Sequence, residues 1–173
     1  MKKGFTMIEL IFVIVILGIL ASVAIPRLAA TRADAEIATT VANLRTLISD
    51  INAYYVAHDT FTTGVGGVRW NEITKVPLEN PDQLAADSGR PGYITVDGER
   101  CIEVQIHNKI GLAPARISFT EYPTNKDRGI CQQALAAEPI RAFTQSTLRF
   151  RNGRSIGILP NAMAIGSTSS IYE

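Results

Sequence analysis

The first hydrophobic pattern in the chain is a long apolar run close to its first residue. Residues 10–25 carry no charge, and Ser22 is the only polar side chain among them. Extended back to Phe5, the run is interrupted only by Thr6 and Glu9. At about 1.5 Å per residue, a helix over this stretch is about 32 Å long, enough to cross the hydrocarbon core of a bilayer. The pattern therefore predicts a membrane-spanning helix.

A second helical pattern follows Pro26. Apolar side chains recur at alternating spacings of four and three residues, the period of one helix face. They are Ile37, Val41, Leu44, Ile48, Ile51 and Tyr55. Because the pattern resumes at once, Pro26 is expected to kink the helix and not to end it. We predict one helix of about 54 residues over 5–58, whose second half packs on a sheet. The alternative is an independent coiled coil.

From residue 93 the period changes to two, which indicates β-strands. Tyr93–Val96 and Glu99–Ile106 flank Asp97-Gly98, a dipeptide typical of a type I′ hairpin turn. The other strand candidates are Ala115–Tyr122 and a second hairpin, Thr147–Arg151 and Arg154–Leu159 around Asn152-Gly153. Loops are expected at 64–67, at 73–91 with a short helix, at 124–129 and at 166–170. We predict an α+β fold, with an antiparallel sheet of about four strands on a long helix.

Composition adds little to this picture. The length of 173 residues fits one domain with an attached element. The formal net charge of +1 gives no overall attraction to nucleic acid or to acidic substrates. His58 and His107 lie far apart, with no cysteine or acidic residue at metal-ligand spacing, and no nucleophile motif of a hydrolase occurs. We therefore expect no catalytic residues and no metal site.

The apolar run has three interpretations. It is a secretory signal peptide cut after Ala24, a plain membrane anchor, or a segment in which Glu9 has a function. Glu9 argues against a signal peptide, and so does Pro26, which lies close to the proposed cut after Ala24. An ionisable group in a membrane segment is costly unless it is paired, so its presence favours a function. The run holds no Lys or Arg. A new α-amino group would serve as partner, if the chain were cut after Gly4.

These residues resemble a known family. The run KKGFTMIEL, residues 2–10, is similar to the processing motif of type IV pilins and type II secretion pseudopilins. In that family a membrane peptidase cuts after the glycine, the new N-terminal phenylalanine is methylated, and the fifth mature residue is glutamate. These features fall here on Gly4, Phe5 and Glu9. The resemblance extends over roughly residues 1–60, and says less about the remainder.

The resemblance implies an organisation and a set of partners. It divides the chain into a leader (1–4), a membrane and filament-core helix (5–26), an amphipathic continuation (27–58) and a β-rich domain (59–173). Glu9 becomes the assembly contact with another copy. The implied partners are a prepilin peptidase, an inner-membrane platform protein, an assembly ATPase and the membrane itself. Lys2 and Lys3 favour a cytoplasmic start and a periplasmic domain on a single-pass anchor.

The resemblance implies a filament subunit for protein secretion, for adhesion or motility, or for DNA uptake, on the cell surface in some of these machines. It implies no enzyme activity and no cofactor. Two other functions stay open. One is a soluble periplasmic binding module released after Ala24. The other is a membrane-tethered enzyme, although no convergent set of catalytic residues supports it.

The only cysteines are Cys101 and Cys131, and no CxxC pair accompanies them. If the domain is exported, a disulfide is the natural expectation. A loop of about thirty residues closed in this way adds about 3–4 kcal/mol in the chain-entropy model. Many pilins carry such a bond near the carboxyl terminus, so the resemblance supports it. The alternative is a pair of buried free thiols.

Two charged groups complete the candidates. Arg149 and Arg151 alternate with apolar residues, and with Arg154 they lie in a stretch without acidic residues. They are expected on the solvent face of a strand, either simply solvated or as a phosphate-contacting patch for DNA. Some secretion pseudopilins bind calcium in loops of the soluble domain. The acidic clusters here are Asp97, Glu99 and Glu103, and Glu79, Asp82 and Asp87, but their spacing matches no calcium loop.

Overall fold

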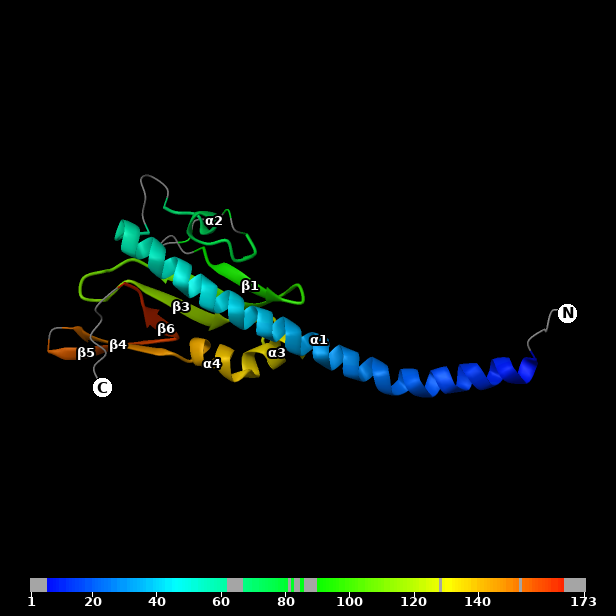
Figure 1. Cartoon of the computed structure of the whole chain (residues 1–173). Helices are drawn as coiled ribbons and strands as arrows, with labels where there is room; N and C mark the ends of the chain where they lie inside the picture. The colour runs from blue at the N-terminus through cyan, green and yellow to red at the C-terminus, as the bar shows by residue number, and fades with distance from the viewer. Residues whose placement is uncertain are drawn as a thin grey trace. The chain divides into compact units, whose positions relative to one another are not determined.

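The structure is a computed structural model of the whole chain (Figure 1). It describes residues 6–61, 67–80, 82, 85, 90–127, 129–152 and 154–166. By its internal contacts the chain divides into a first unit, Met1–Glu36, and a second unit, Ile37–Glu173. The long helix α1 (Met7–His58) belongs to both units, and each unit is described by itself. The domain limits predicted at 26 and 58 remain predictions.

The first unit consists of the opening part of α1. Side chains from Thr6 to Leu28 are exposed, including large apolar ones such as Phe12 at 66% and Leu20 at 61%. The most apolar 18-residue window of the helix has a mean hydropathy of 2.9 and no buried residue. Among the described residues this is the one helix that could span a membrane by length and composition. An exposed, uniformly apolar helix is the pattern expected of a segment that lies in lipid.

In the second unit, the rest of α1 packs into the hydrophobic core, as predicted. The most buried positions on this helix are Thr40, Leu44, Leu47 and Ile51. Leu44 and Ile51 were in the predicted stripe, whereas Thr40 and Leu47 were not. The stripe residues Ile37, Val41, Ile48 and Tyr55 are partly buried against the same core. The stripe therefore covers the core, and a separate coiled coil is excluded for this segment.

The sheet under the helix has four antiparallel strands in the order β1-β2-β3-β6. They are β1 (Gly92–Val96), β2 (Glu99–His107), β3 (Arg116–Glu121) and β6 (Ala162–Ala164). Asp97 and Gly98 join β1 to β2 with φ of 49° and 79°. Positive φ at both positions matches the predicted type I′ turn. The predicted architecture, a long helix on an antiparallel sheet of four strands, is confirmed.

Neither strand of the second predicted hairpin belongs to this four-stranded sheet. The second hairpin, β4 (Thr147–Asn152) and β5 (Ser155–Pro160), forms a two-stranded sheet of its own. The last pair in its register is Asn152 with Ser155, so Arg154 lies in the turn and not in the strand as predicted. Strand β6 has three residues, too few to show a period of two.

Three short helices cover the remaining parts of the core. Helix α2 (Trp70–Ile73) lies just before the loop in which a short helix was expected. Helices α3 (Gly129–Ala136) and α4 (Glu138–Thr144) were not predicted. In Figure 1 they lie between the end of β3 and the start of β4. They bury Ala134 and Ile140 in the core, and Phe143 of α4 contacts Phe119 with ring centroids 5.9 Å apart.

Candidate assembly site at the start of the long helix

The residues that open α1 form a hydrogen-bonded cap around Glu9. Thr6 precedes the helix, and its backbone N–H and hydroxyl donate to Glu9 Oε2 over 2.8 and 2.7 Å. The backbone N–H of Glu9 donates back to the Thr6 hydroxyl oxygen at 3.4 Å. This reciprocal arrangement is a capping box, which satisfies donors that the first helical turn leaves free. This cap was not predicted from the sequence, although Thr-x-x-Glu before an apolar run is its signature.

The carboxylate lies on an apolar face. A shallow groove there is lined by Ile8, Glu9, Phe12 and Val13, which are neighbours on a helix surface. Ile8 is 76% exposed and Phe12 is 66% exposed. Among the described residues, the contacts of this carboxylate are with Thr6. A charged group on an exposed apolar helix face is suited to a cation supplied from outside the segment.

Gly4 and Phe5, the predicted processing residues, lie outside the described residues.

Pro26 lies inside α1, and the helix continues to His58. Proline has no N–H, so it cannot donate to the carbonyl of Ser22 one turn earlier. The hydroxyl of Ser22 donates to the carbonyl of Ile19 at 2.7 Å. The continuation through Pro26 agrees with the expected helix, and the kink itself stays a prediction.

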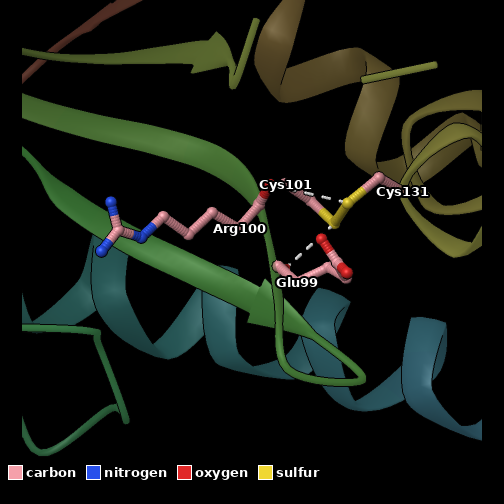
Figure 2. The surroundings of a disulfide bond; sticks show 4 residues. All are labelled: Glu99, Arg100, Cys101 and Cys131. Carbon is pink, nitrogen blue, oxygen red and sulfur yellow. Dashed lines mark hydrogen bonds between the residues drawn. A yellow bond between two sulfur atoms is a disulfide. The ribbon is translucent and has the colours of Figure 1, made fainter. Parts of the chain in front are cut away.

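The two cysteines form a disulfide, with their Cα atoms 5.2 Å apart (Figure 2). It connects β2 with the first turns of α3, and both residues are fully buried. In the register of β1 and β2, Ile94 pairs with Ile102 and Thr95 with Arg100, which leaves Cys101 as an extra residue in a β-bulge. The bulge buries Cys101 beside Ile102, where strict alternation would expose one of them. The structure thus has the bonded pair that was expected and not the free thiols of the alternative.

Arg100, beside the disulfide, points the opposite way from Cys101 in Figure 2. Its Nε donates to Glu79 Oε2 at 2.6 Å, and its Nη2 donates to the other carboxylate oxygen. The guanidinium lies 4.8 Å from the ring centroid of Tyr93. These hydrogen bonds hold the pKa of Glu79 below its ordinary value of 4.5. One of the predicted acidic residues therefore serves as an ion-pair partner that ties the loop before β1 to the sheet.

The three arginines of the predicted patch are exposed on the β4–β5 hairpin. Arg149 and Arg151 lie in β4, and Arg154 is in the turn. The structure thus brings them onto one hairpin, as expected, and Arg149 and Arg151 share its outer face.

In the described parts of the chain, no group of three or more His, Cys, Asp or Glu residues could hold a metal ion. The expectation that this chain holds no metal ion, calcium included, stays a prediction.

Comparison with known proteins identifies the start of the chain. Residues 1–25 match a family model described as the prokaryotic N-terminal methylation motif. The chain carries this motif. The match includes Gly4, Phe5 and Glu9, the residues that carry the resemblance to type IV pilins and type II secretion pseudopilins. The resemblance is therefore confirmed.

Curated relatives extend the likeness into the domain. The chain is 30% identical over 93 residues to the type II secretion system core protein G of Escherichia coli, which covers 54% of this chain and 61% of that protein. It is 31% identical over 81 residues to the protein of the same name from Dickeya chrysanthemi, covering 47% of this chain and 52% of that one. With the type IV major pilin protein PilE of Neisseria gonorrhoeae, identity is 33% over 88 residues, 46% of this chain and 53% of that one.

The chain thus spans between half and two thirds of the length of these relatives. No solved structure matches it. The relatives and the motif support a pilus or pseudopilus subunit with an apolar anchoring helix and a small α+β domain.

Proposed function

We propose that this chain is a structural subunit of a type IV pilus-like filament or a type II secretion pseudopilus, and not an enzyme. One observation carries the proposal. A methylation motif opens an exposed apolar helix that bears a single carboxylate in its first turn, and the same helix continues into the core of a sheet domain. This arrangement suits a subunit that waits in a membrane and then packs its helix among other helices. The role requires no cofactor.

Processing is part of the proposal. A prepilin peptidase hydrolyses the peptide bond between Gly4 and Phe5, and the α-amino group of Phe5 is then methylated. The mature amine is the cation that the apolar segment otherwise lacks, since residues 5–25 contain no Lys or Arg. In the filament, Glu9 of one copy pairs with the amine of a neighbour. The pairing offsets the cost of placing either charge in an apolar environment.

The proposed topology follows from charge and redox state. Lys2 and Lys3 precede the span, which favours a cytoplasmic start and a periplasmic domain on a single-pass inner-membrane anchor. The disulfide between Cys101 and Cys131 suits an oxidising compartment. Assembly would need the inner-membrane platform protein and the assembly ATPase. The names of the relatives support secretion and pilus formation as the leading roles, and DNA uptake rests on the arginines alone.

Filament formation can be tested in cells that express the full chain with a pilus or secretion assembly system. Sheared material is examined by electron microscopy with an antibody to the domain. We expect labelled filaments from the wild type and none when the prepilin peptidase is deleted. A wild-type chain that is processed and present in the membrane but never enters filaments would contradict the proposal. Release of the domain as a soluble protein would favour the binding-module alternative.

A further inference from the structure

One end of the second unit combines cations with exposed aliphatic side chains. β2 runs away from the β1–β2 turn, so the β2–β3 connection lies at the opposite end of the sheet. In Figure 1, β4 ends and β5 begins toward that same end of the sheet, at the left of the view. We call this the basic end. Its residues are Lys109, Ile110, Leu112, Arg149, Arg151, Arg154, Ile156 and Ile158.

The hairpin places the two kinds of side chain on one face. Arg149 is paired with Ile158, and Arg151 with Ile156. Directly paired residues of an antiparallel ladder point to the same side. Ile156 is 67% exposed and Ile158 is 59% exposed, and both arginines are exposed. The opposite face carries Leu148, which is buried, and is the face turned to the domain.

We expect a face of this kind to bind a partner. A two-stranded hairpin is marginally stable by itself, and exposed β-branched residues beside an unpaired strand edge invite association. In the connection between β2 and β3, Ile110 is 63% exposed and Leu112 is 61% exposed. In the described part of the second unit, the exposed large hydrophobic side chains are Val56, Ile110, Leu112, Ile156 and Ile158. Their concentration beside cations indicates an interface with a surface that is partly apolar and acidic.

The other end of the sheet is acidic. Glu121 ends β3 and is exposed, and it pairs with Ile102 in the first half of β2. Asp127 is exposed in the turn that follows, in which Lys126 also lies. Asp97 and Glu99 are at the adjacent β1–β2 turn, where they also make interactions within the chain. We call this the acidic end, defined by Asp97, Glu99, Glu121 and Asp127.

We propose that the basic end of one copy docks on the acidic end of the next copy, head to tail, when the chain assembles. The inference rests on the proposed filament function. A contact between two different surfaces of the same chain is heterologous, and such contacts generate helical filaments when they do not close into rings. The opposite charges set the order and register of neighbouring domains, and the isoleucines supply apolar area that is removed from water.

DNA is the competing occupant of the basic end. Phosphate contacts need cations, and they make no use of exposed isoleucines spaced between the arginines. The mixed face therefore favours a protein surface. Arg149 and Arg154 carry the charge argument, because Arg151 already makes an interaction within the chain.

Charge reversal tests the contact in the full chain. One variant is Arg149→Glu with Arg154→Glu, a second is Glu121→Lys with Asp127→Lys, and a third combines all four changes. Sheared filaments are measured at equal membrane levels of subunit. We expect each pairwise reversal to lower filament yield about tenfold, since exposed pairs contribute up to about 1 kcal/mol each and reversal adds repulsion. The combined variant should recover to within about threefold of wild type.

The controls separate this inference from the proposed function. Arg69→Glu reverses an exposed cation at the start of α2 and should leave filament yield unchanged. Ile156→Ser with Ile158→Ser should lower yield without any charge change. The head-to-tail contact is wrong if the variant with all four changes does not regain filament yield. It is also wrong if reversal of the basic end abolishes DNA binding while filaments still form. If the wild type forms no filaments, the proposed function itself is wrong.

Discussion

Replacing Glu9 with Gln separates the two roles that this residue has in our account. Glutamine keeps an oxygen that can accept from the N–H and hydroxyl of Thr6, so the helix cap is retained in weakened form. It carries no charge, so it cannot neutralise the amine of a neighbouring Phe5. The matched variant Thr6→Val does the opposite, because it removes the hydroxyl from the cap and leaves the carboxylate in place.

The two changes should differ greatly in size. A capping side chain contributes about 1 kcal/mol, so Thr6→Val should lower filament yield by about fivefold. Removing one member of a buried ion pair leaves the other charge unpaired and costs about 3–5 kcal/mol. At about 1.4 kcal/mol per tenfold, Glu9→Gln should lower the yield by at least about a hundredfold. The difference is expected because the cap is local to one chain, whereas the ion pair joins two.

The assay compares sheared filaments from wild type, Glu9→Gln and Thr6→Val, after each is shown to be cleaved and present in the membrane at equal amounts. Thr6→Ser, which keeps a hydroxyl, is the conservative control and should behave as wild type. Wild-type filament yield from Glu9→Gln would refute the pairing. Equal losses from Glu9→Gln and Thr6→Val would mean that the carboxylate acts through the cap alone.

Three predictions concern the stability of the domain. Joint replacement of Cys101 and Cys131 by Ser should lower the free energy of unfolding by about 3–4 kcal/mol, measured by urea denaturation of the full chain in detergent. Leu47→Ala should cost about 2–5 kcal/mol in the same assay, since Leu47 is fully buried, and the exposed Thr46→Ala should cost far less. The pKa of Glu79 is lower in the folded chain than in the unfolded chain, so its ionised form stabilises the fold at pH values above the unfolded-state pKa. This stabilisation is lost as the pH falls through the folded-state pKa. Glu79→Gln should therefore weaken the pH dependence of stability below about pH 4.5, and an unchanged acid limb would refute it.

Patterns with a clear period were sufficient for much of the fold. The long helix, the β1–β2 hairpin and β3 all follow from the spacing of apolar residues, and the positive φ of Asp97 and Gly98 follows from the Asp-Gly dipeptide. The missed elements are short. α3 has eight residues, α4 has seven and β6 has three, so none is long enough to show a period. Their structure depends on packing against the core.

Which positions of α1 are buried could not be predicted without the tertiary contacts. Leu47 and Thr40 are buried because the sheet lies against a slightly different face of α1 than the most apolar stripe suggested. For the disulfide, the resemblance supported the pairing, but the bulge that buries Cys101 is a feature of strand register and was not predictable from spacing. For the assembly site, the carboxylate was found as a charge in an apolar run. Its cap, in which Thr6 is the partner, is a local contact that the search for a cation on another copy does not predict.

The intact mass of the protein extracted from membranes or filaments under non-reducing conditions tests the central claim most directly. The account predicts a chain that begins at Phe5, carries one methyl group on that residue, and lacks two hydrogens because Cys101 and Cys131 are bonded. Fragmentation of the amino-terminal peptide then locates the methyl group. A mature chain that begins at Ile25 would instead show release after Ala24, and an uncut chain that begins at residue 1 would contradict the processing on which the filament account depends.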